Sequence, residues 1–153
     1  MPVSVASSRD EPGRDPVLLG DLIGFHLRLA TTRMMNDLRP ALADLELRPV
    51  LFAILELVRV NPGIIQMRVG DELGVQRANL VPLINELMKR GAIKRKIAKH
   101  DKRAYSLYLT ATGELLHDRA KRVVLEHEER ILKRLNATDR NKLRWLLDEV
   151  AVD

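Results

Sequence analysis

The fold is decided by residues 66–110, which read QMRVGDELGVQRANLVPLINELMKRGAIKRKIAKHDKRAYSLYLT. The first part predicts a short helix from about Gln66 to Leu73, because Gly74 is typical of a helix C-terminus. After the turn Gly74-Val75-Gln76, a second helix is predicted from near Arg77 to Gly91. Its buried face consists of apolar residues at helical spacing: Leu80, Leu83, Ile84, Leu87 and Met88. A short helix, a tight turn and a second helix are typical of a helix-turn-helix, and Gly70 permits the close crossing of the two helices.

After Gly91 the pattern changes from helix to strand. Ala92–Ile97 and Tyr105–Leu109 are short and β-capable, and the charged loop Ala98–Ala104 connects them as a hairpin. A helix-turn-helix followed by a hairpin is the order of a winged helix-turn-helix. The sequence therefore predicts a mainly α-helical fold with a small β-hairpin wing and an all-helical region for dimerisation.

The positive charge of the chain is concentrated in one stretch. The whole sequence has 26 Lys and Arg residues against 21 Asp and Glu, a formal net charge of +5. Between Lys89 and Arg103 lie eight Lys and Arg residues and one acidic residue, Asp101, a net charge of +7. Such a surface repels itself unless a polyanion is near. A solvated lysine-rich loop is the plain interpretation, but the flanking helix-turn-helix favours a phosphate-binding surface.

The outward face of the second helix suits the major groove of DNA. Asn side chains read adenine edges, small apolar groups contact thymine methyls, and a helix N-terminus favours phosphate. Arginine suits a narrow, electronegative minor groove. An ordinary packed helical bundle also needs the buried leucines, yet it does not explain an acid-poor face followed by the basic stretch. The residues predicted to contact DNA are Gln76, Arg77, Ala78, Asn79, Pro82, Asn85, Lys89, Lys99, Lys102 and Arg103.

The pattern divides the chain into four parts. Residues 1–16 are rich in Pro, Gly and Ser and are interpreted as a mobile N-terminal tail. Residues 17–48 form a dimerisation helix, residues 49–110 the winged helix-turn-helix domain, and residues 111–153 the C-terminal dimerisation helices.

Prolines, a glycine and a threonine mark the helix boundaries outside the helix-turn-helix. The first helix is expected to start at Val17, and Pro40 is expected to end or kink it near Leu38 or Arg39. Pro49 suits the first turn of the next helix. A long helix follows residues 110–113, and Thr138 caps the last helix.

The long C-terminal helix needs a partner surface. At about 20 residues it spans about 30 Å, which is more than one small winged domain covers. The first helix also carries two adjacent apolar stripes, wider than a surface helix needs. Self-association as a homodimer covers both, and two-fold symmetry then places two second helices about 34 Å apart, one turn of DNA.

The sequence resembles the MarR family of transcription regulators. The resemblance rests on Asp101-Lys102-Arg103-Ala104-Tyr105-Ser106-Leu107-Tyr108-Leu109-Thr110 followed by Gly113, which match the family's wing pattern, and on residues 71–75 and 87–91. It implies a homodimer, pseudo-palindromic operators and repression relieved by a small ligand. By position, Arg103 is implied to be the minor-groove arginine, and Asp101 is implied to hold the wing in shape by pairing with a nearby cation.

Two residues depart from the family pattern. Arg48 stands where a Ser or Thr often caps the helix, so that helix start is expected to be less well capped. Pro82, inside the second helix, removes one backbone hydrogen bond and is expected to bend the helix, which leaves the choice of base-contacting residues open.

Two polar residues interrupt an apolar stripe of the first helix. His26 and Arg33 lie seven residues apart on the side of Leu29. In one interpretation, His26 is a core histidine whose hydrogen bonds are made within the protein, and Arg33 forms a salt bridge in an interface. The other is an effector pocket in which a cation meets an anionic ligand against Phe25 and Leu29. The family resemblance implies an aromatic acid or its coenzyme A thioester as the small-molecule effector.

Several function classes find no support in the sequence. There are no cysteines, the histidines His26, His100, His117 and His127 lack metal-ligand spacing, and no phosphate-binding glycine loop or nucleophile motif is present. We therefore expect no enzyme activity, no cofactor and no metal. Without an apolar run of about 18 residues or a signal peptide, no membrane partner is expected and the location is expected to be cytoplasmic. The alternatives are an architectural DNA-binding protein without an effector and a helical module that binds an acidic protein.

Overall fold

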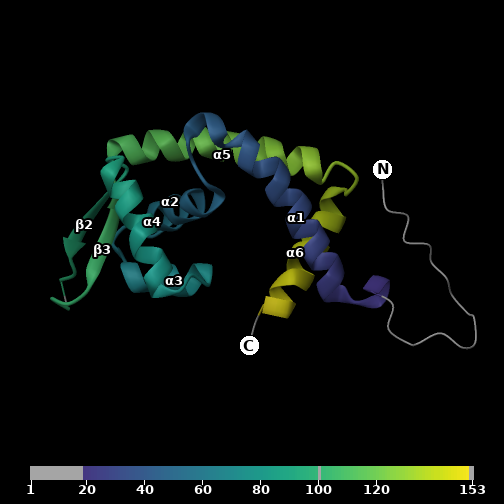
Figure 1. Ribbon diagram of the computed structural model, residues 1–153, viewed down its shortest axis with the longest axis horizontal. Coiled ribbons are helices and arrows are strands. Elements are labelled where there is room, and N and C mark those ends of the chain that lie inside the picture. The colour runs from purple at the N-terminus through teal and green to yellow at the C-terminus, as the bar shows by residue number, and fades with distance from the viewer. Residues whose placement is uncertain (1–18, 100, 152–153) are drawn as a thin grey trace, which may run out of the picture. The chain divides into compact units, whose positions relative to one another are not determined.

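The computed structural model describes residues 19–99 and 101–151 and confirms the predicted fold class. Six α-helices and one three-stranded antiparallel sheet make up the described part of the chain (Figure 1). In chain order the elements are η1 (Leu19–Asp21, a 3-10 helix), α1 (Ile23–Ala41), η2 (Ala43–Leu45, a 3-10 helix), α2 (Pro49–Val60), β1 (Ile64–Ile65), α3 (Gln66–Leu73), α4 (Arg77–Lys89), β2 (Ile93–Ile97), β3 (Tyr105–Leu109), α5 (Ala111–Ile131) and α6 (Ala137–Ala151).

The chain folds as two compact units whose boundary falls between Asn36 and Asp37, inside α1. In the first unit, none of residues 19–36 is fully buried. Several large apolar side chains are instead exposed there: Leu19, Leu22, Ile23 and Leu29. The described part of this unit therefore has no enclosed core within a single chain. The predicted tail, residues 1–16, lies outside the described residues.

The second unit contains a well-packed core. Apolar residues of α2, α4 and β3 meet there with almost no solvent exposure: Leu51, Ile54, Leu55, Val58, Leu80, Ile84, Leu87 and Leu107. Pro49 occupies the first position of α2, as predicted, where its missing N–H breaks no helical bond. Arg48 offers no side-chain cap to this helix and forms an ion pair with Glu86 of α4 instead.

The turn between α3 and α4 depends on two glycines. Gly74 ends α3 in the left-handed conformation, with φ of 61°. A Cβ at Gly70 would lie 2.9 Å from the backbone oxygen of Val75 and 3.2 Å from Cδ2 of Leu80. The expectation that Gly70 permits a close crossing is thereby confirmed.

The hairpin belongs to a sheet with one strand more than predicted. The strand order is β1-β3-β2, and all pairs are antiparallel. Ile64 pairs with Leu107 and Ile65 with Ser106, so β1 closes the sheet on the side of β3 opposite to β2. A strand of two residues has no measurable period, which is why the sequence does not reveal it.

Helix α5 starts at a tightly packed junction. The Thr110 hydroxyl accepts the N–H of Gly113 at 3.0 Å and donates to the carbonyl oxygen of Gly91. A Cβ at Gly113 would lie 2.0 Å from the oxygen of Ala92. Only glycine therefore fits at this position, and the start of α5 is held against the end of the helix-turn-helix.

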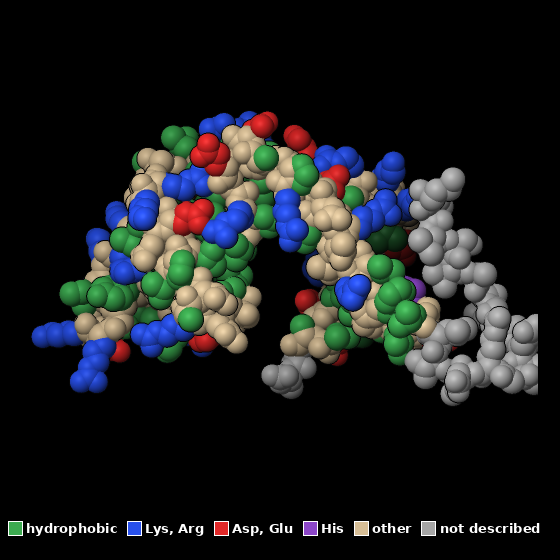
Figure 2. Space-filling view, in the orientation of Figure 1, with side chains coloured by type: hydrophobic (Ala, Val, Ile, Leu, Met, Phe, Trp, Pro, Cys, Tyr) green, Lys and Arg blue, Asp and Glu red, His purple; other side chains and the backbone are tan. Residues whose placement is uncertain are grey.

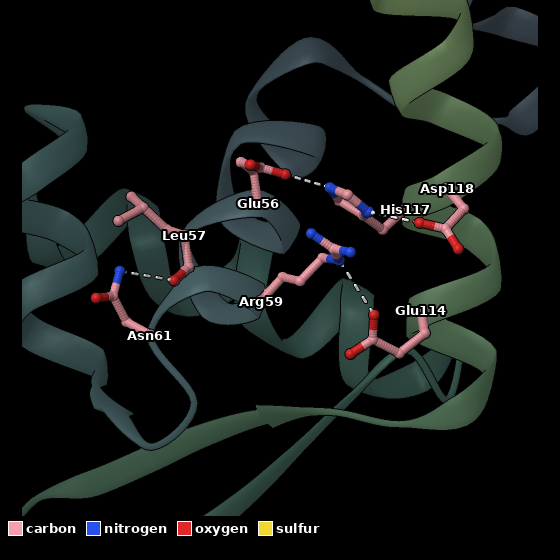
Figure 3. Close-up of polar contacts among 7 residues, drawn as sticks. All are labelled: Glu56, Leu57, Arg59, Asn61, Glu114, His117 and Asp118. Carbon is pink, nitrogen blue, oxygen red and sulfur yellow. Dashed lines mark hydrogen bonds and ion pairs between the residues drawn. The ribbon is translucent and has the colours of Figure 1, made fainter.

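Polar side chains also tie α5 to α2 (Figure 3). The buried His117 ring forms hydrogen bonds with the Glu56 carboxylate and, at 3.3 Å, with Asp118. It stacks on Phe52 with 5.6 Å between ring centroids. Beside it, Arg59 Nε and Glu114 Oε2 form an ion pair at 3.3 Å. These contacts hold α5 against α2, and none of them was predicted.

Three predicted helix starts are wrong. Helix α5 begins at Ala111 and contains Gly113, rather than following residues 110–113. Helix α1 begins at Ile23, not at Val17, because Leu19–Asp21 form a separate 3-10 turn. Pro40 does not end α1, which continues to Ala41, since a proline in the last turn costs a single backbone hydrogen bond. Helix α6 begins at Ala137, and Asn136 rather than Thr138 caps it: Asn136 Oδ1 accepts the N–H of Asp139 at 2.9 Å. No helix in residues 19–99 or 101–151 is long and apolar enough to cross a membrane.

The carboxylate of Asp37, near the end of α1, is expected to make the stability of the fold sensitive to acid. Arg130 donates a hydrogen bond to Asp37 at 2.6 Å and His127 Nδ1 lies 2.7 Å from the same carboxylate, and these contacts lower the pKa of Asp37 from 3.8 to about 2. Because the pKa is lower in the folded state, the stabilisation is present above pH 3.8 and is lost as the pH falls toward 2. Above pH 3.8, we expect Asp37→Asn to have a lower free energy of unfolding than the wild type. Between pH 3.8 and 2, the free energy of unfolding of Asp37→Asn should fall less than that of the wild type. Urea unfolding at a series of pH values measures both effects.

The matched control for this prediction is Asp44→Asn, which changes an exposed carboxylate of η2. It should follow the pH dependence of the wild type. Equal pH dependence of Asp37→Asn and the wild type would show that the Asp37 contacts do not stabilise the fold.

Candidate nucleic-acid interface

Helix α4 presents the predicted face to solvent. Leu80, Leu83, Ile84 and Leu87 are buried against the core. The residues on the other side are all exposed: Gln76, Arg77, Ala78, Asn79, Pro82, Asn85 and Lys89. The helix continues from Arg77 to Lys89 with Pro82 inside it, so Pro82 does not end it. This face is therefore open to solvent in the described part of the chain, and none of the seven residues on it is acidic.

The N-terminus of α4 is available for an anion. Gln76 stands at the N-cap position, and no side chain forms a capping hydrogen bond there. The first turn contains no acidic residue. The free N–H groups and the helix dipole therefore favour a phosphate next to Gln76 and Arg77.

The hairpin places cations at its tip. Lys99, Lys102 and Arg103 are exposed, and Figure 2 shows Lys and Arg side chains projecting from the hairpin end of the molecule. Asp101 Oδ1 accepts the backbone N–H of Arg103 at 2.8 Å, and the N–H of Ala104 donates to the Asp101 carbonyl at 3.0 Å. The partner of the Asp101 carboxylate among the described residues is thus a backbone amide, not the side-chain cation that the family resemblance implied. His100 lies outside the described residues.

One predicted base-contacting residue has a partner within the chain. Asn85 Oδ1 accepts a hydrogen bond from Arg95 Nη2 of β2 at 3.2 Å. Sequence reasoning missed this contact, because a helical wheel gives the direction of Asn85 but not the strand register that brings Arg95 to it. Asn79, in contrast, forms no side-chain hydrogen bond within the described chain.

A second feature missed by sequence reasoning is a cavity of about 220 Å³ between α3, the start of α4 and the hairpin. Gln66, Arg77, Arg103 and Tyr105 contribute to its wall. The Gln66 Oε1 atom is buried and has no hydrogen-bond partner among the described residues. The cavity therefore lies on the same surface as the predicted DNA-contacting arginines.

The predicted effector residues lie together in the first unit. The rings of Phe25 and His26 meet edge to face with 6.1 Å between centroids, and His26 Nε2 lies 2.6 Å from the carbonyl oxygen of Gly20. Phe25 is half-buried, whereas His26, Leu29 and Arg33 are exposed. The His26 ring therefore forms a hydrogen bond with a backbone carbonyl, but His26 is not a core residue of the single chain.

A short helix, a tight turn, a second helix with one exposed face and a cationic hairpin define this chain as a DNA-binding protein of the winged helix-turn-helix class. The transcriptional repressor CouR, solved on a 23-mer DNA duplex, shares this structure with a TM-score of 0.82 and 31% sequence identity, over 90% of this chain and all of the CouR chain (100%). The chain belongs to the MarR family of transcription regulators.

Other known proteins agree with this assignment, although no family model matches the chain. It is 28% identical over 126 residues to a putative transcriptional regulatory protein for the hcr operon of Thauera aromatica, which covers 82% of this chain and 76% of that protein. CouR bound to p-coumaroyl-CoA gives a TM-score of 0.78 and 32% identity over 88% of this chain and 95% of that one. MarR of E. coli has the same fold, with a TM-score of 0.72 and 22% identity over 84% and 96% of the two chains.

Proposed function

We propose that this protein is a homodimeric repressor that binds a pseudo-palindromic operator and is released by a small anionic ligand, an aromatic acid or its coenzyme A thioester. The observation that carries the DNA-binding part is the exposed, acid-free face of α4, which continues into the +7 stretch of the hairpin. On this proposal α4 enters the major groove and the hairpin places Arg103 in the adjacent minor groove. Asp101 shapes the hairpin tip from which Arg103 projects.

The homodimer rests on apolar surface that the single chain leaves open. In α6, none of the residues is buried, and Leu143, Leu146, Leu147 and Val150 lie on one side of the helix. In the first unit, Leu22 and Leu29 are likewise exposed. A two-fold partner would cover such surfaces and set two α4 helices about 34 Å apart.

The effector class rests on two observations. Arg33 is an exposed cation on a helix that also carries Phe25 and Leu29, so an anionic group and an aromatic ring find suitable partners on this helix. CouR, which has been solved with p-coumaroyl-CoA, is 32% identical to this chain. We therefore assign the effector to Phe25, His26, Leu29 and Arg33.

Selection of bound duplexes from random DNA tests the proposed function. We expect an inverted repeat with half-sites about one helical turn apart, bound at least ~10³-fold more tightly than unrelated DNA. Adding p-coumaroyl-CoA or p-coumaric acid, with free coenzyme A as the control, should lower operator affinity in a gel-shift titration. Similar affinity for all duplexes would favour the architectural alternative, and binding unchanged by every probe would contradict the effector assignment.

A pair of arginines separates effector binding from DNA binding in the same assay. Arg33→Met should raise the concentration of ligand needed for release and leave operator affinity unchanged. Arg28→Met, an equal change of an exposed arginine about a turn and a half away on α1, is the matched control and should behave as the wild type.

A further inference from the structure

Two cations of the basic stretch are turned toward the protein rather than toward solvent: Arg90, which donates to the carbonyl oxygens of Leu45 and Glu46, and Arg95 of the hairpin. On β2, Lys94 and Lys96 are exposed, whereas Arg95 is half-buried. The strand register explains the difference, because Arg95 pairs with the buried Leu107 of β3 and its side chain follows the core face of the sheet. Arg95 therefore differs from its neighbours in what it contacts.

Arg95 joins the hairpin to helix α4. Its Nη2 donates to Asn85 Oδ1 at 3.2 Å, and its guanidinium carbon lies 4.9 Å from the centre of the Tyr105 ring. Its Nε is buried and has no partner among the described residues. A guanidinium group only donates hydrogen bonds, so the amide atom of Asn85 that faces it must be the oxygen. One side chain thus contacts both strands of the wing and the outward face of α4.

These contacts leave little of the guanidinium for DNA. One face of it lies on Tyr105, one Nη donates to Asn85, and Nε is enclosed. A phosphate contact by Arg95 would require the loss of at least one of these interactions. Lys99, Lys102 and Arg103 need no such rearrangement, because they already project into solvent.

We propose that Arg95 is a positioning residue that fixes the hairpin relative to α4, so that the helix and Arg103 meet the two grooves of DNA together. This inference rests on the proposed binding mode, in which α4 and the hairpin contact the same duplex. When α4 and Arg103 are held at a fixed spacing, binding of one to the duplex places the other at its groove. When the spacing is free to vary, the second contact forms less favourably and the affinity falls. Arg95 acts on specific binding through Asn85 and Tyr105 rather than through its charge.

Salt dependence separates positioning from direct phosphate contact. Each phosphate contact contributes about 0.9 to the slope of log affinity against log salt. We expect Arg95→Met to lower affinity for the selected operator about tenfold, with the salt slope and the affinity for unrelated DNA unchanged. The matched control is Lys102→Met, which removes one cation from the tip of the same hairpin and should reduce the slope by about 0.9 per subunit. A reduced slope for Arg95→Met would overturn the proposal.

A double-mutant cycle adds an independent readout. If Arg95 positions the hairpin for Arg103, then Arg95→Met should have little further effect once Arg103→Ala has removed the minor-groove contact. A tenfold loss that persists in the Arg103→Ala protein would overturn the proposal. Tyr105→Leu removes the ring against which the Arg95 guanidinium lies, at a position outside the predicted DNA-contacting residues, and should also lower operator affinity with an unchanged salt slope, which keeps the test decisive if Arg95→Met does not fold.

The same assays distinguish failure of this inference from failure of the proposed function. A wild-type protein that does not discriminate the selected operator from unrelated DNA contradicts the proposed function itself. A wild-type protein that discriminates normally, together with an Arg95→Met protein that retains full operator affinity, contradicts only the role of Arg95.

Discussion

Leu143→Asp is expected to convert the protein to monomers and to lower operator affinity at least ~1000-fold. Leu143 lies on the side of α6 that also carries Leu146, Leu147 and Val150, and all four are between 39% and 68% exposed in the single chain. A charge placed among them would be buried without a partner in a two-fold interface, which is far more costly than exposing it in a monomer. A monomer then reads one half-site, so about half of the specific contacts are lost.

Sedimentation velocity and a gel-shift titration with the selected operator measure the two parts of this prediction. The control is Asn141→Asp, which introduces the same charge in the same turn of α6 but on the opposite side of the helix. It should remain dimeric with unchanged operator affinity. A Leu143→Asp protein that stays dimeric would place the interface elsewhere, and a monomeric wild type that binds the operator tightly would contradict the homodimer.

The elements of the second unit could be predicted where one local rule decides the conformation. Pro49 begins α2 and Gly74 ends α3, because each position has a backbone requirement that one residue type meets best. The two-residue strand β1 could not be predicted, since its hydrogen bonds go to β3, more than forty residues along the chain. Asn136 and Thr138 are both good caps, and local sequence does not decide between them.

The candidate site, too, could be predicted from the sequence only in part. The helical period of the buried leucines determines which side of α4 is exposed, so the exposed face followed from the sequence. The contacts of the individual exposed side chains could not be predicted from the sequence. Asn85, for example, contacts Arg95 only because of the register of β2 and β3. His117 and His127 lacked any metal-ligand pattern in the sequence, and the structure pairs them with Glu56 and Asp37, which are 61 and 90 residues away.

Arg103→Ala is expected to lower operator affinity about 10- to 100-fold per subunit contact, in line with the loss of one groove-reading arginine. The stability of the protein should not change, because the Arg103 side chain is exposed and its backbone N–H, which Asp101 accepts at 2.8 Å, remains in the variant. The effect should be largest on operators with A·T pairs below the hairpin, where a narrow minor groove concentrates negative potential. Thermal unfolding and gel-shift titrations on A·T and G·C versions of that position measure the three statements.

Two further variants determine whether the loss comes from the arginine at that position. Asp101→Ala keeps Arg103 but removes the acceptor that shapes the tip, so its loss of affinity should lie between those of the wild type and Arg103→Ala. Arg122→Ala removes an exposed arginine from α5, outside the predicted surface, and should bind as the wild type. Arg103→Ala and Arg122→Ala each lower the net charge by one, whereas Asp101→Ala raises it by one, so equal losses in the two arginine variants together with tighter binding by Asp101→Ala would mean that net charge, not the place of Arg103 on the hairpin, determines DNA affinity. Only a graded series, with Arg103→Ala weakest, Asp101→Ala intermediate and Arg122→Ala unchanged, supports a hairpin that reads the minor groove through this residue.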